Sequence, residues 1–152
     1  MCRSFPIASS VNCYLRFVLI ALVIAFLAGC GSGTPWSPVP VTGKVTYEDG
    51  SVIPVKSMKL YFSPQTPPKD PKTYPREGVA IIDVATGSFQ NVTTYKYNDG
   101  LIPGKHKVMV VAYDGERTLS PKVPKKCASF STTPIVIDTA TLPLEIKVPK
   151  PK

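Results

Sequence analysis

The chain has little histidine, little cysteine and few acidic side chains for its length of 152 residues. A single histidine excludes a self-contained multi-histidine metal centre, and four cysteines are too few for a disulfide-built scaffold. Seventeen prolines and ten glycines follow no repeat, which excludes a collagen-like helix. With 43% hydrophobic and 18% charged residues, the chain is not a disordered polyelectrolyte. The length leaves room for one folded domain.

The short motifs that carry catalysis or metal binding are also missing. The sequence contains no HxH, HxxxH or CxxC pair, and neither GxSxG nor SxxK. We therefore predict no catalytic residue, no metal ligand and no cofactor, and we expect a protein that is not an enzyme. An enzyme built from Asp and Glu residues that meet only in the folded chain stays open. We expect no nucleic-acid partner, because no recognised binding motif accompanies the net charge of +8.

Residues 1–29 have the pattern of a secretory signal. Twelve apolar residues run without interruption from Phe17 to Ala28, after Arg3 and Arg16, and no acidic residue occurs in residues 1–29. A permanent membrane-spanning helix needs about 20 apolar residues, so this run favours a signal that is removed.

The end of this segment, Leu27-Ala28-Gly29-Cys30, resembles the lipobox of bacterial lipoproteins. The resemblance implies cleavage between Gly29 and Cys30, with a diacylglycerol on the Cys30 sulfur. We therefore expect an exported protein, lipid-anchored to a bacterial membrane and facing the periplasm or the cell surface; which membrane holds it stays open. Residues 30–40 read as the lipidated cysteine and a tether, flexible at first and stiffer at its prolines.

Residues 41–149 are predicted to form a single small all-β sandwich of about seven strands. β-Branched residues are abundant, apolar residues alternate with period two, and prolines recur too often for long helices. A short basic tail, residues 150–152, follows. The expected strands are 41–47, 58–63, 78–84, 88–94, 105–113, 135–137 and 144–148, with 78–94 forming a hairpin and residues 108–112 buried on both faces.

The sequence Val41-Thr42-Gly43-Lys44-Val45-Thr46-Tyr47, followed by Gly50, is similar to the opening of many small bacterial lipoproteins. Segments 60–64, 83–89, 100–108 and 132–135 match in the same order. The proteins that it resembles carry a transthyretin-like, or carboxypeptidase-regulatory-like, β-sandwich. The resemblance implies this fold and an envelope setting, and it implies no catalysis.

Two residues with reactive side chains have plain structural interpretations. Cys127 has no cysteine partner once Cys2 and Cys13 leave with the signal and Cys30 is lipidated. We expect a buried, inert thiol there, with an intermolecular disulfide as the alternative. His106 lies between two lysines at the start of strand 105–113, and we expect a surface or edge histidine.

Binding surfaces are harder to place from sequence. The long loops 64–76 and 114–134 are rich in proline and are interpreted as crossovers or as binding loops. Tyr95 and Tyr97 lie two residues apart and would share a face if their segment were a strand, giving a platform for sugar stacking. The scattered lysines favour protection of strand edges, with contact to anionic lipid or to an envelope polymer as the alternative.

These features favour a membrane-anchored, non-enzymatic structural or protein-interaction module. A carbohydrate-binding surface lipoprotein is the second hypothesis, and an enzyme with no recognisable local motif is the third. The sequence leaves the partner and the oligomeric state open.

Overall fold

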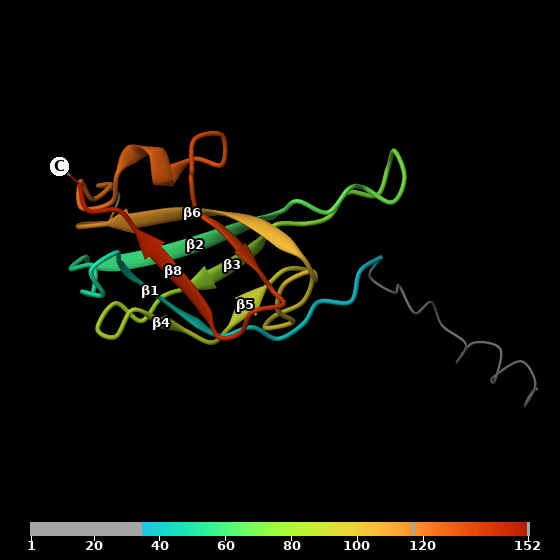
Figure 1. Cartoon of the computed structure of the whole chain (residues 1–152), viewed down its shortest axis with the longest axis horizontal. Coiled ribbons are helices and arrows are strands. Elements are labelled where there is room, and N and C mark those ends of the chain that lie inside the picture. The colour runs from blue at the N-terminus through green and yellow to red at the C-terminus, as the bar shows by residue number, and fades with distance from the viewer. Residues whose placement is uncertain (1–34, 117, 152) are drawn as a thin grey trace, which may run out of the picture. The chain divides into compact units, whose positions relative to one another are not determined.

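A computed structural model describes residues 35–116 and 118–151 of the chain. The expected signal, the cleavage site at Gly29 and Cys30, and the first part of the tether lie outside these residues. The described part is all-β, and two sheets pack as a small β-sandwich (Figure 1). This confirms the predicted fold class, with eight strands where about seven were expected.

The strands fall into one sheet of three and one of five. The smaller sheet has the order β4-β1-β8 and the larger β5-β3-β2-β6-β7. The only helical element among the described residues is a short 3₁₀ helix, η1. The bounds are β1 Gly43–Tyr47, β2 Ser57–Pro64, β3 Gly78–Ile81, β4 Ser88–Phe89, β5 Val92–Thr93, β6 Lys105–Tyr113, η1 Lys125–Ala128, β7 Val136–Asp138 and β8 Leu144–Val148.

Strands β2 and β6 form the centre of the larger sheet and supply much of the core. Their antiparallel register sets Leu60 opposite Val110 and Phe62 opposite Val108. Every second side chain of each strand is buried, apart from Pro64 at the end of β2, as period-two alternation predicts. Met109 is only half-buried, however, as is Val111, so β6 is buried on one face and not on both. Within the described part of the chain, no further layer of strands covers the outer face of this sheet.

The predicted hairpin over residues 78–94 forms at its turn and at its open end, but its returning strand is interrupted. β3 pairs with β5, but the intervening β4 leaves this sheet and pairs with β1 of the other sheet. Ser88 still bridges Asp83, so the chain turns as a hairpin before it separates. Residues 88–93 therefore connect the two sheets instead of forming one continuous strand.

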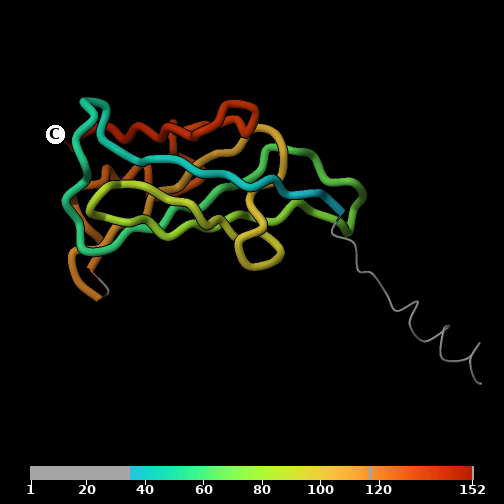
Figure 2. The backbone as a smooth tube through the Cα atoms, turned by 90° about the horizontal axis from the view of Figure 1, so that it is seen from below, coloured from blue at the N-terminus to red at the C-terminus, as the bar shows by residue number. Residues whose placement is uncertain are grey.

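The two long loops differ in how far they join the fold. Most residues of loop 64–76 are exposed, as expected of a proline-rich crossover. In loop 114–134, by contrast, η1 carries Cys127 into the core, and Val123 of the same loop is also a core residue. Val39, within the expected tether, also joins the domain, because its backbone pairs with Leu101 in both directions at 2.8 and 3.0 Å. Figure 2 shows the first described residues and the C-terminus at opposite ends of the domain.

Candidate functional site

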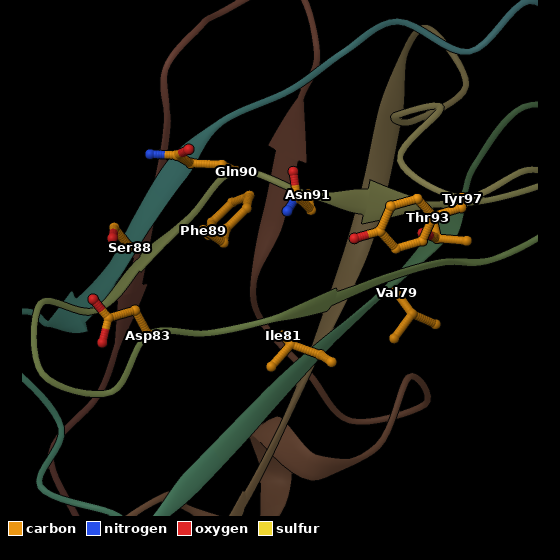
Figure 3. A pocket seen from close by; sticks show the side chains of 9 residues that line it. All are labelled: Val79, Ile81, Asp83, Ser88, Phe89, Gln90, Asn91, Thr93 and Tyr97. Atoms are coloured by element: carbon orange, nitrogen blue, oxygen red, sulfur yellow. The ribbon is translucent and has the colours of Figure 1, made fainter.

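A groove of about 710 Å³ lies beside β3, where the following segment leaves the sheet. Figure 3 shows Asp83 and Ser88 at one end of the groove, Thr93 and Tyr97 at the other, and Ile81 between them. The lining residues are Val79, Ile81, Asp83, Ser88, Phe89, Gln90, Asn91, Thr93 and Tyr97.

The groove exists because the pairing of residues 88–93 changes sheet twice. Ser88 is bridged to Asp83, Phe89 then pairs with Gly43 of β1, and Thr93 returns to pair with Val79 of β3. Between these points the chain separates from β3 and leaves a gap along it. The groove was not predicted, because residues 88–94 were expected to form one strand.

The groove combines an aliphatic floor with neutral polar groups. The side chains of Val79 and Ile81 point away from the core, and Ile81 is 71% exposed. Gln90 and Asn91, both exposed, supply amide donors and acceptors along one wall. The sequence signal for this surface was the apolar run Val79-Ala80-Ile81-Ile82. Such a run places apolar side chains on both faces of a strand, and the face that does not join the core is left for another group to cover.

Asp83, the one acidic residue among those lining the groove, serves the adjacent turn. Its carboxylate accepts hydrogen bonds from the backbone N–H of Ala85 at 3.0 Å and from the Thr86 hydroxyl at 2.8 Å. These contacts are those of an Asp that stabilises a turn. The groove is therefore suited to binding by shape and neutral hydrogen bonds.

Tyr95 and Tyr97 do not lie on a strand, so they do not share a strand face. Their segment follows β5 as a turn organised by Asp99, whose carboxylate accepts backbone hydrogen bonds from Thr94, Tyr95 and Lys96 at 2.8–2.9 Å. Burial tends to raise the pKa of Asp99, but these hydrogen bonds outweigh it and hold the pKa below its usual value.

The two tyrosines therefore have different surroundings. Tyr97 is 84% exposed and borders the groove. The Tyr95 ring lies 5.3 Å from the guanidinium carbon of Arg76, and its hydroxyl is buried with no hydrogen-bond partner among the described residues. Of the predicted pair, only Tyr97 is part of the groove.

His106 is fully buried, with 0% exposure, so the predicted surface or edge position is wrong. It shares the inward face of β6 with Val108 and Val110. Its Nδ1 lies 3.1 Å from the carbonyl oxygen of Gly104, which only accepts, so Nδ1 carries the proton. Nε2 is buried without a partner among the residues that the structure describes. Burial lowers the pKa of His106, against smaller raising effects of the Gly104 hydrogen bond and the Asp138 charge.

This burial predicts acid destabilisation that begins near pH 6.5. Above that pH His106 is neutral in both states; below it the unfolded chain takes up a proton that the folded chain resists, so stability falls until the pH drops below the lowered pKa. Urea unfolding between pH 7 and 5 should show this loss, and His106→Gln should flatten it. Asp70 and Asp99, whose pKa values are lowered from 3.8, act below this window. An unchanged slope in His106→Gln would contradict the assignment.

Cys127 is buried and unpaired, as expected of an inert thiol. Burial raises the pKa of its thiol, with Lys126 lowering it less strongly. An intermolecular disulfide would require η1 to expose this side chain.

No group of three or more His, Cys, Asp or Glu side chains suited to a metal ion occurs within residues 35–116 and 118–151. In the same part of the chain, no helix is long and apolar enough to cross a membrane. Comparisons with protein families, curated proteins and solved structures found no match to this chain. The fold and the groove define the class as a small all-β domain of two sheets with an open surface groove.

Proposed function

We propose that the protein is a lipid-anchored, non-enzymatic binding module of the bacterial cell envelope. The lipobox-like Leu27–Cys30 segment supports the anchor. The groove beside β3 supports the binding role, and it is the observation that carries this proposal. Val39 already pairs with Leu101, so the binding domain begins within nine residues of the proposed lipid-bearing Cys30.

We also propose that the sandwich is of the transthyretin-like kind. The opening segment of the resemblance, residues 41–47, consists of β1 and the two residues before it. The 100–108 segment of the resemblance contains the turn that leads into β6, with Gly100 at φ 94° and Gly104 at φ 117°. These positions support the family as a proposal at the level of strand order and turns.

The occupant that we favour for the groove is an extended segment of another envelope protein. The exposed floor of Val79 and Ile81 offers apolar area to alternate side chains of such a segment. The amides of Gln90 and Asn91 can satisfy its backbone groups. The one lining carboxylate, Asp83, is already engaged by its own turn, which favours a neutral ligand.

Substitution of Ile81 by aspartate is expected to weaken this binding about tenfold or more, because a charge would replace the most exposed aliphatic contact. A photo-reactive amino acid at position 81, used in intact cells, should first give a crosslink to one protein, which mass spectrometry identifies. Titration of that purified protein against the wild type and Ile81→Asp then measures the loss.

Val136→Asp is the matched control, since Val136 is a 54% exposed aliphatic residue on β7, away from the groove. It should bind as the wild type does. Equal crosslinking from positions 81 and 136, or equal affinity of the two aspartate variants, would contradict a role for the groove.

Carbohydrate binding is the second candidate, favoured by the exposure of Tyr97 at one end of the groove. Its ring is free to stack on a sugar while Asn91 and Thr93 offer hydrogen bonds nearby. Glycan-array binding that disappears in Tyr97→Ala and survives in Tyr74→Ala, which removes another exposed tyrosine, would favour this candidate over a protein ligand.

A further inference from the structure

One end of the domain brings the start of the described chain together with the loop between β2 and β3. Lys69 donates a hydrogen bond from Nζ to the carbonyl oxygen of Pro35, and the same ammonium lies 5.4 Å from the centre of the Trp36 ring. Figures 1 and 2 both show the β2–β3 loop reaching the end at which the described chain begins. We name Pro35, Trp36 and loop residues 65–77 the anchor-side end.

The loop at this end has a defined tip. Asp70 accepts a hydrogen bond from the Lys72 N–H at 2.8 Å, and Asp70 and Thr73 form a backbone bridge. The Thr73 hydroxyl, and then the Lys72 N–H, lower the pKa of the Asp70 carboxyl, so this acid is engaged within the loop. Lys69 and Lys72 are exposed beside it, and Tyr74 is 64% exposed. The tip thus presents cations and an aromatic ring to its surroundings.

The covalent chain limits how far this end can be from a lipid on Cys30. Pro35 lies five positions after Cys30, and a fully extended chain covers at most about 3.6 Å per position, or about 18 Å. Because Val39 is already paired with Leu101, the residues after it add no further slack. This step rests on the proposed lipidation of Cys30.

We infer that the anchor-side end binds the membrane surface, with Trp36 and Tyr74 at the headgroup level and Lys69 and Lys72 facing anionic headgroups. Tryptophan and tyrosine favour the membrane–water interface, and lysines near an anionic surface are attracted to it. Two acidic residues, Asp70 and Glu77, also lie at this end and offset the charge of the two lysines. Membrane binding therefore depends on the aromatic contacts together with Lys69 and Lys72. The docked domain would stand on this end with its C-terminus away from the bilayer (Figure 2).

Two lysines at the far end of the domain are already paired with acidic residues. Lys122 binds Asp114 at 3.4 Å, and Lys150 forms an ion pair with Asp49. Lys125 is exposed on η1, the short helix that Figure 1 draws at the other end of the domain from the start of the described chain. It therefore provides a matched control for the tip lysines.

Trp36 is the single tryptophan of the chain, so its fluorescence reports on the anchor-side end alone. The protein extracted from membranes is reconstituted into phosphatidylcholine vesicles with brominated acyl chains, with or without phosphatidylglycerol. We expect the brominated chains to remove about half of the Trp36 emission, and to remove more when phosphatidylglycerol is present. Lys72→Glu should lower the docked-to-undocked ratio roughly fivefold or more, whereas Lys125→Glu should leave it unchanged.

The intact mass of the same sample distinguishes docking of the anchor-side end from lipidation of Cys30. A lipidated, vesicle-bound protein with unquenched Trp36 would overturn docking of this end while leaving the proposed anchor in place. A protein without added lipid would overturn the anchor itself. Equal quenching with and without phosphatidylglycerol, or equal effects of Lys72→Glu and Lys125→Glu, would overturn recognition of anionic headgroups.

Discussion

Replacing Cys30 by serine is expected to remove the protein from the membrane fraction almost completely. The thiol is the group that would form the thioether to diacylglycerol, and a hydroxyl does not replace it. Each buried CH₂ contributes about 0.8 kcal/mol, and a single acyl chain binds only marginally, so retention depends on two or three chains on one residue. Losing all of them changes partitioning by many orders of magnitude.

Fractionation and intact mass measure this result. The wild type should begin at Cys30 with added acyl mass, whereas Cys30→Ser should carry no acyl mass and should leave the membrane fraction. Cys13→Ser is the matched control, because Cys13 lies in the segment that the signal would lose. If Cys30→Ser stays in the membrane at the wild-type level, or if the wild type carries an unmodified Met1, the anchor is refuted.

Local alternation was enough to predict most strands and much of the core. Met58, Leu60 and Phe62 are buried as their spacing indicates, since a pleated strand turns alternate side chains to one face. The same alternation places His106 on the inward face with Val108. Its two lysine neighbours suggested the surface instead, although neighbours in a strand point to the opposite face.

Local sequence patterns do not predict the groove, because the groove depends on pairing between distant segments. Phe89 joins the smaller sheet through Gly43, forty-six residues earlier, and nothing in residues 88–94 alone specifies that partner. The sequence around Ile81 predicts an ordinary strand residue. Its side chain is 71% exposed because the next segment separates from β3. Tyr97 was recognised as a candidate, but for a strand that is a turn in the structure.

Substitution of Gly100 by alanine is expected to destabilise the domain by about 3–4 kcal/mol. Gly100 has φ 94°, a left-handed conformation that costs an alanine about 1–2 kcal/mol. A Cβ there would also lie 1.9 Å from the carbonyl oxygen of Val39, so the Val39 backbone must move. That movement breaks its two hydrogen bonds with Leu101, each of which contributes about 1 kcal/mol.

Gly104→Ala separates the cost of the positive φ from the cost of the close approach to Val39. Gly104 also has positive φ, at 117°, but the nearest atom to its added Cβ would be the Thr66 hydroxyl at 3.6 Å. It should therefore lose only the conformational part, about 1–2 kcal/mol, by urea unfolding at pH 7.5. If both variants lose the same stability, the close approach of Val39 contributes nothing. If Gly100→Ala alone is strongly destabilised, the segment that follows the proposed anchor is an integral part of the fold, and the tether ends before Val39.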